Sequence, residues 1–257
     1  MEDFVHLHVH SHFSKGWGIG GVERLCSAAA ALGMRRLALT DTNGLYGLVP
    51  FLQAAREHGI TPIAGSELVH GGRRAVLLVK DEAGYANLSA MISARHCDPD
   101  FDLIQVLRER RRGLTVLSDD IRLLKALRRD SRDDLFVEMS PGYGMARAYA
   151  FARGSGLPPV ATSRVFLVER GDFPLHRILR AIAENSTLSR LRPADVCREA
   201  DFLQPPPAMI DQFPHAPAAV ANTLRVADGC LTAWEFNRIV FPRFAGMGDR
   251  EAFDRLY

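Results

Sequence analysis

Apolar and polar positions follow two alternating repeat lengths along most of the chain. Apolar residues recur at helical spacing in residues 21–34, 48–59, 84–95, 120–130, 144–156 and 172–185. Short apolar runs typical of buried strands occupy residues 35–41, 60–68, 73–81, 113–120, 134–140 and 157–166. This alternation of strands with helices predicts an α/β fold with a parallel sheet that closes into a barrel or stays open.

The pattern changes after residue 204. Three successive prolines, at positions 205–207, interrupt the alternation of strands and helices. Helical periodicity then resumes, and residues 246–257 predict a final helix that begins near Asp249 and lacks a glycine or other stop signal. We therefore expect a domain of residues 1–204, a short and mainly helical segment of residues 205–257, and a longer parent polypeptide of which this chain is a fragment.

Residues 4–14, FVHLHVHSHFS, place four histidines at every second position. In an extended strand, side chains two residues apart point to the same face. His6, His8, His10 and His12 are therefore expected to share one face of a strand. Imidazoles gathered in this way can bind a divalent metal, although a His-x-His pair also arises by chance.

Composition narrows the class of protein. The chain has 257 residues, is 47% hydrophobic and carries a formal net charge of +2, as expected of a globular protein with a large core. Its four cysteines are widely separated, which argues against a zinc ribbon or disulfide framework and favours the reducing cytoplasm. No apolar segment is long enough to span a bilayer, so no membrane partner is expected. The basic run RERRRG at residues 108–113 has two interpretations, a solvated helix face or a nucleic-acid contact.

Several polar side chains stand where predicted strands end. They are the pair His8 and His10, then Asp41, Glu67, and the pair Asp119 and Asp120. The carboxyl ends of parallel barrel strands meet at one face, so these side chains are expected to lie together. Histidines and carboxylates in one cluster suit metal-dependent phosphoester hydrolysis, because the metal activates water and neutralises the leaving oxygen. Asp41 has an alternative role, which is to cap the Asn-Gly turn that follows it.

These stretches resemble a known family. FVHLHVHSHFS, LGMRRLALTDTNGLYGLVPFLQAAREHGITPIAGSEL and VLLVKDEAGYANLSAMIS are similar, in this order, to the amino-terminal polymerase-and-histidinol-phosphatase (PHP) domain of the bacterial DNA polymerase III α-subunit. Later segments, including GLTVLSDD and LPPVATSRVF, extend the resemblance over nearly the whole chain. The resemblance implies a distorted (β/α)7-type PHP barrel, with residues 205–257 leading toward the polymerase palm and the nucleotidyl-transfer residues beyond Tyr257. The GLYG sequence at residues 44–47 favours the error-prone branch.

The chain departs from the family pattern at positions that hold metal in other members. Thr42 stands where the resemblance calls for a histidine, Trp17 stands where a ligand follows the first motif, and Gly142 is one of three residues in place of a histidine. In the final motif, Arg164 and Phe166 replace an aspartate and a histidine. An arginine brings positive charge into a site built for cations, and phenylalanine has no ligand atom.

The implied ligands that remain are His8, His10 and Glu67, which can hold one zinc or manganese ion with an open position. Asp41 or Asp120 would complete the shell or orient a ligand histidine. We therefore expect one divalent metal or none, and no residue is assigned a catalytic role. The remaining ligands cannot rebuild a two- or three-metal phosphoesterase centre.

Two functions follow from the resemblance. In the first, the chain is the N-terminal PHP domain of a DNA polymerase III α-like protein and is a catalytically degenerate scaffold that supports DNA synthesis by the parent. In the second, it is a residual metal-dependent phosphoesterase or 3′→5′ exonuclease, so whether the fragment itself is an enzyme stays open. A free-standing interaction module is a third alternative. The expected partners are the remaining domains of the parent, DNA through the parent, and other replication or translesion proteins.

Overall fold

The computed structural model describes residues 4–234 and 246–256. The strands are β1 (Arg36–Leu39), β2 (Thr61–His70), β3 (Arg73–Val79), β4 (Leu114–Ser118), β5 (Leu135–Met139) and β6 (Pro159–Ala161). The helices are α1 (Val22–Ala31), α2 (Leu48–Glu57), α3 (Glu82–Cys97), α4 (Leu103–Arg110), α5 (Ile121–Leu127), α6 (Met145–Ser155), α7 (Phe173–Ala183), α8 (Pro206–Ile210), α9 (Pro217–Asp228) and α10 (Asp249–Leu256), with 3₁₀ turns η1 (Arg170–Asp172) and η2 (Pro193–Asp195). The elements expected between residues 21 and 185 are present, and α4 lies outside those expected ranges.

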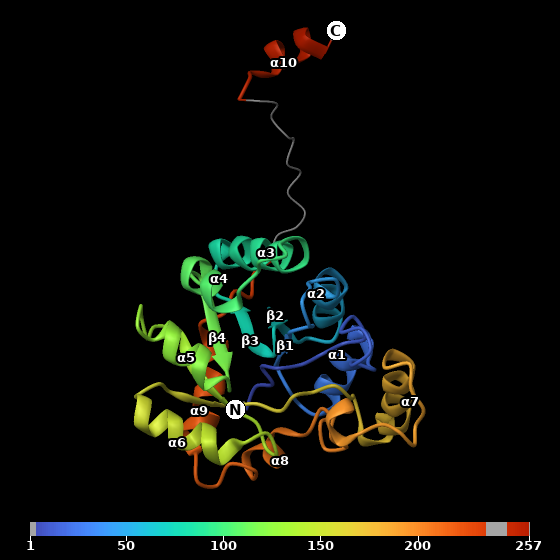
Figure 1. Ribbon diagram of the computed structural model, residues 1–257. Coiled ribbons are helices and arrows are strands. Elements are labelled where there is room, and N and C mark those ends of the chain that lie inside the picture. The colour runs from blue at the N-terminus through green and yellow to red at the C-terminus, as the bar shows by residue number, and fades with distance from the viewer. Residues whose placement is uncertain (1–3, 235–245, 257) are drawn as a thin grey trace.

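The strands form one curled, six-stranded sheet in the order β1 to β6, with helices on its outside (Figure 1). The β1–β2, β4–β5 and β5–β6 pairs are parallel, whereas β3 is antiparallel to both of its neighbours. The expectation of a parallel sheet is therefore wrong at β3. Gly71 and Gly72, with φ angles of 56° and 73°, close a tight hairpin between β2 and β3. The start of β3 consequently lies at the same edge of the sheet as the ends of β2 and β4.

The N-terminal segment, residues 4–10, lies between β1 and the chain beyond β6. Isolated bridges join His6 to Leu37 and Val9 to Val165. The Ala38 N–H donates to the His6 carbonyl at 3.0 Å, and the Val165 N–H donates to the His8 carbonyl at 3.0 Å. This segment links the two sides of the curled sheet, so the fold is the expected α/β class with a distorted barrel.

Alternating residues of the strands supply two apolar layers. In β3, Leu77 packs outward in a cluster that includes residues of α3–α6, whereas Val76 and Leu78 belong to an interior cluster. Side chains two residues apart share a face, so Arg74 points into the barrel on the same side as Val76. The alternation that builds the core thus also directs a charged residue inward at the edge of the sheet.

The residues after the proline run pack against the sheet. Met209 of α8 joins the outer apolar cluster, and Val226 and Ala227 of α9 join the interior cluster. The Val5 N–H donates to Thr223 Oγ1 at 3.2 Å, which ties α9 to the N-terminal segment. The domain boundary at residue 204 stays a prediction, and the predicted final helix corresponds to α10.

Two further expectations concern cysteines and membranes. The four cysteines are free, with Cys97 exposed and the others buried. Within the two described ranges, none of the helices combines the length and the apolar character that crossing a bilayer requires.

The contact between α3 and the start of β4 leaves no room for a side chain at Gly84. A Cβ atom there would lie 1.8 Å from the Gly113 carbonyl oxygen. We expect Gly84→Ala to lower the free energy of unfolding by about 1–3 kcal/mol, because the backbone must move. Gly154→Ala in α6 is a matched control with nothing within 4 Å of the added atom, and it should be neutral or stabilise by about 0.5–1 kcal/mol. Urea denaturation that gave equal effects for both variants would contradict this packing.

His6 makes folding stability depend on pH. Its ring is fully buried between Ser163 Oγ and the Gln204 carbonyl, both at 2.9 Å, and burial lowers its pKa to about 4. In the unfolded chain, His6 therefore binds a proton near pH 6.5, whereas in the folded chain it binds that proton only near pH 4. His6 stabilises the fold fully above pH 6.5, and about 3 kcal/mol of that stability is lost as the pH falls to 4. In His6→Asn, denaturation between these pH values should show a shallower loss than in the wild type, and an unchanged slope would contradict the assignment.

Candidate metal centre

Three of the predicted site residues meet at the edge of the sheet. His8 and His10 come from the N-terminal segment and Glu67 from β2, and potential ligand atoms of all three lie within 4.8 Å of one another. All three side chains are buried. In the part of the chain that the structure describes, these residues form the one cluster of three or more histidine, cysteine or acidic side chains with this spacing.

The four histidines of the N-terminal segment do not share one environment. His6, His8 and His10 are fully buried, whereas His12 is exposed. His6 bonds to Ser163 and Gln204 instead of joining the cluster. The expectation of a common face is therefore wrong for His12, because the backbone enters a turn there and its side chain is exposed.

Asp41 contacts the cluster through a serine. Its carboxylate accepts bonds from the Ser11 N–H, the Ser11 hydroxyl and the Ser14 hydroxyl, each at 2.7 Å. Burial raises the pKa of Asp41 despite these bonds. Ser14 Oγ also lies 3.0 Å from His10 Nδ1, so Asp41 is placed to orient this histidine.

Asp120 lies apart from the histidines. Its carboxylate caps α5 by accepting the Arg122 N–H at 2.8 Å, and it pairs with Arg73 at 3.0 Å. These local contacts account for its position at the end of a strand. The assignment of Asp120 as a metal ligand stays a prediction.

Arg74 is the principal residue that the sequence analysis missed. Its guanidinium lies 3.1 Å from Glu67 Oε1, 2.8 Å from Glu138 Oε2 and 2.9 Å from Asp119 Oδ1. The sequence HGGRR at residues 70–74 could have indicated the position of Arg74. Gly-Gly between two strand patterns predicts a tight hairpin, which places the residues after it beside the end of the preceding strand. Arg74 thus brings a fixed positive charge among three carboxylates.

Arg164 points toward the same cluster. Its Nη2 lies 2.6 Å from Asp119 Oδ2, and its guanidinium lies 4.0 Å from the centroid of the Tyr143 ring. Phe166, two residues further on, stacks on His10 with ring centroids 4.4 Å apart. Phe166 therefore contacts the cluster with an apolar face, whereas Arg164 binds Asp119, which also binds Arg74.

Glu138, at the end of β5, is the second residue that the sequence analysis missed. Its carboxylate is fully buried, lies 2.7 Å from His8 Nδ1 and accepts the Thr162 hydroxyl at 2.8 Å. Burial alone would raise the pKa of Glu138, but the charges of Arg74 and His8 hold it well below its ordinary value. A strand residue two positions after the interior Phe136 faces the barrel, which is the pattern that could have revealed it.

One chain of hydrogen bonds links Glu138 to Asp41 through His8, His10 and Ser14. Burial would lower the pKa of His8, yet the Glu138 and Glu67 carboxylates raise it, whereas burial lowers the pKa of His10 to about 3. His8 Nδ1 lies 2.7 Å from Glu138 Oε1, and its Nε2 lies 3.0 Å from the Nε2 atom of His10. His10 Nδ1 lies 3.0 Å from Ser14 Oγ, and the Ser14 hydroxyl donates to Asp41.

These donors fit one metal ion better than several. Two imidazoles and a carboxylate supply the three protein ligands of a zinc site with an open position. Binding would require the Nε2–Nε2 hydrogen bond between His8 and His10 to break, and it would place the ion near Arg74 and Arg164. A second ion fits poorly, because the carboxylates of Glu138 and Asp119 already bind arginine.

A cavity of about 330 Å³ opens over the cluster. Glu67, Arg74 and Arg164 line its charged side, and Trp17 and Phe166 line its apolar side. Of the cluster, Glu67 lines this partly apolar cavity, whereas His8 and His10 are fully buried and do not line it.

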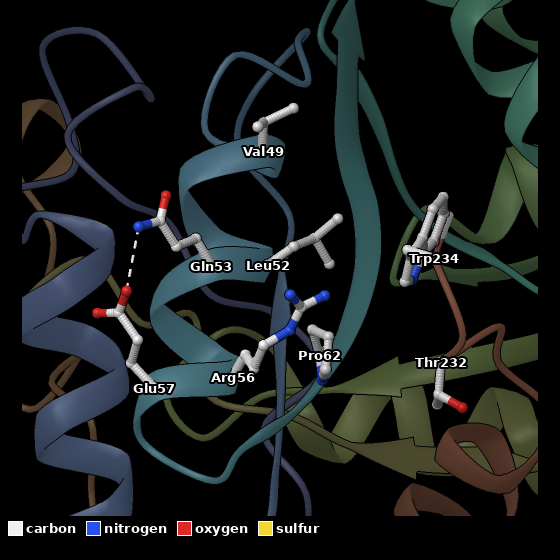
Figure 2. Close-up of a pocket in the computed structure, with 8 residues that line it drawn as sticks. All are labelled: Val49, Leu52, Gln53, Arg56, Glu57, Pro62, Thr232 and Trp234. Carbon is white, nitrogen blue, oxygen red and sulfur yellow. Dashed lines mark hydrogen bonds between the residues drawn. The ribbon is translucent and has the colours of Figure 1, made fainter. Parts of the chain in front are cut away.

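A groove of about 490 Å³ lies between α2 and the residues that follow α9, which include Thr232 and Trp234. Figure 2 shows Val49, Leu52 and Arg56 on one side of it and Trp234 on the other. Its acidic residue, Glu57, accepts a bond from Gln53 at 3.0 Å. Its lining residues hold no grouping of metal ligands or nucleophiles, so the histidine cluster is the candidate site.

Comparisons with known proteins agree with this architecture. Residues 6–181 match the family described as the PHP domain. The chain is 32% identical over 289 residues to an error-prone DNA polymerase of Symbiobacterium thermophilum, covering 94% of this chain and 26% of that protein. It is 30% identical over 295 residues to the DNA polymerase III subunit alpha of Escherichia coli, covering 98% of this chain and 25% of that protein. The chain therefore spans about a quarter of the length of these relatives.

A solved structure supports the fold. A two-domain protein from Bacteroides vulgatus, containing a predicted PHP-like metal-dependent phosphoesterase, matches with a TM-score of 0.50 and 14% identity, covering 81% of this chain and 62% of that chain. At this identity the match concerns the fold alone. Taken with the family match across residues 6–181, the curled sheet and the histidine segment, it leads to one conclusion: the chain belongs to the PHP domain family.

Proposed function

We propose that this chain is the N-terminal domain of a DNA polymerase III α-like protein and serves as a scaffold without phosphoesterase activity. The similarity to two DNA polymerases over at least 94% of the chain supports the choice of parent. In this proposal, other domains of the parent carry out DNA synthesis in the cytoplasm. The domain contacts those domains, DNA through the parent, and other replication or translesion proteins.

The observation that carries the scaffold proposal is the position of the Arg74 guanidinium among Glu67, Asp119 and Glu138. Two buried carboxylates, Glu67 and Glu138, beside the partly exposed Asp119 would attract divalent cations. Here Arg74 and Arg164 supply two fixed positive charges, and the Glu138 and Glu67 carboxylates raise the pKa of His8, which favours a third. The cluster is then electrically balanced by the protein alone, which removes the main attraction for a metal ion.

An apolar surface on α7 supports a role in contacts with other protein domains. Leu175, Ile178 and Ile182 are 54%, 46% and 72% exposed, while the buried face of the helix carries His176 and Arg180. The helix therefore directs two of its polar residues inward and an apolar stripe outward. Exposed stripes of this kind are typical of interaction surfaces.

The second candidate function is a residual phosphoesterase that holds one metal through His8, His10 and Glu67. The spacing of their ligand atoms, within 4.8 Å, favours it. A bound divalent ion would supply a nucleophilic hydroxide at neutral pH. In that case Asp41, through Ser14, would orient His10.

Metal content separates the two candidates. We expect the untagged chain, dialysed against trace zinc and manganese, to retain far less than one ion per chain by elemental mass spectrometry, because the cluster is already neutral. Retention of one ion that is lost in His8→Ala would instead support the phosphoesterase. Two or more ions would contradict both candidates.

Removal of Arg74 tests the charge balance directly. Arg74→Met leaves the buried Glu138 without its main counter-charge, so we expect the free energy of unfolding to fall by about 3–5 kcal/mol. Arg73→Met is the matched control, since its partner Asp120 is partly exposed, and it should cost less than about 1 kcal/mol.

The same variants also test whether the vacated position accepts a metal. Zinc should raise the melting temperature of Arg74→Met and leave that of the wild type unchanged, because only the variant has carboxylates without a cation. An equal zinc shift in the wild type would contradict the scaffold proposal.

A further inference from the structure

A separate cavity of about 470 Å³ shares the lining residue Arg74 with the cavity over the histidine cluster. Its walls come from the β2–β3 turn, the end of β4 and the first residues of α5 and α6. This arginine cavity is lined by four arginines, Arg73, Arg74, Arg122 and Arg147, and by the two acidic residues that follow β4. Positive charges thus outnumber negative charges by two, from four arginines and two aspartates.

The acidic residues of the arginine cavity are already paired. Asp120 binds Arg73 at 3.0 Å and caps α5, and Asp119 binds Arg74 at 2.9 Å and Arg164 at 2.6 Å. These contacts leave neither carboxylate free to neutralise a further cation. The excess positive charge therefore belongs to the remaining lining arginines.

Those remaining arginines are Arg122 and Arg147. Both are exposed, and neither guanidinium has a hydrogen bond or ion pair with any residue of the described ranges. They stand at the first turns of two different helices, α5 and α6, on the wall of one cavity. Two uncommitted guanidinium groups on one concave surface are an arrangement suited to a multivalent anion.

The β2–β3 turn leaves space for such an anion. Gly71 and Gly72 both have positive φ angles, and no atom lies within 4 Å of a Cβ built on either residue. The turn therefore presents bare backbone to the cavity entrance, where larger residues would fill the space and be strained.

We propose that the arginine cavity binds a phosphate group, with Arg122 and Arg147 as the donors. Guanidinium groups match the geometry of phosphate oxygens and stay charged at all physiological pH values. The cavity is large enough to hold the phosphate together with the molecule that carries it. The phosphate comes either from a free anion or from the backbone of a nucleic acid strand. This site does not depend on the proposed function, because it uses neither a metal nor the histidines.

Binding measurements on the complete chain test this site. Inorganic phosphate is titrated by calorimetry, and a labelled single-stranded oligonucleotide is titrated by fluorescence anisotropy at several salt concentrations. The test variant is the double substitution Arg122→Gln with Arg147→Gln. The control, Arg153→Gln with Arg190→Gln, removes two exposed arginines outside the cavity and so changes the net charge equally.

We expect the test variant to lose about tenfold or more in affinity and the control to bind as the wild type does. Binding of inorganic phosphate would identify a free anion as the ligand, and binding of the oligonucleotide alone would identify a strand phosphate. For the oligonucleotide, the slope of log affinity against log salt should become shallower by about 1.4 in the test variant, since two phosphate contacts are lost. No binding of either probe, or equal weakening in both variants, would overturn the proposal. Thermal unfolding checks that both variants fold, and the metal content of the chain bears on neither result.

Discussion

The geometry of the candidate site depends on the contact of the Arg74 guanidinium with Glu67, Asp119 and Glu138. Carboxylates withdrawn from water are costly unless a cation and hydrogen bonds compensate them. Arg74 meets this requirement from within the chain. Its charge lowers the pKa of Glu138, and the Glu138 carboxylate in turn raises the pKa of His8. The histidine pair is therefore arranged by an arginine on a neighbouring strand.

Much of the fold could be predicted from the sequence, because helices and strands between residues 21 and 185 have clear periods. The direction of β3 could not be predicted from period alone, since a strand has the same period in both directions. We searched for site residues at the carboxyl ends of the predicted strands. Arg74 was missed because it lies near the beginning of β3. Only the Gly-Gly turn before it carried the missing information.

The candidate site could be predicted only in part. His8, His10 and Glu67 meet as their positions suggested, since strand ends and family resemblance both pointed to them. Asp41 and Asp120 have the same sequence context, but their carboxylates are used by nearby hydroxyl and backbone groups. The contact of Asp120 is local in the sequence, whereas Asp41 binds serines that precede it by 27 and 30 residues, and neither contact is visible in the residue pattern.

The β2–β3 hairpin affects how much two ion pairs of the site, Glu67–Arg74 and His8–Glu138, contribute to the free energy of unfolding. Glu67 and Arg74 are seven residues apart, whereas His8 and Glu138 are separated by 130 residues. The ends of a short loop meet often in an unfolded chain, so the charges of the hairpin pair still attract one another after unfolding. The charges of the distant pair no longer attract one another once the chain unfolds. Of two contacts that look alike in the folded protein, the one between distant residues therefore contributes more to the difference between the folded and unfolded states.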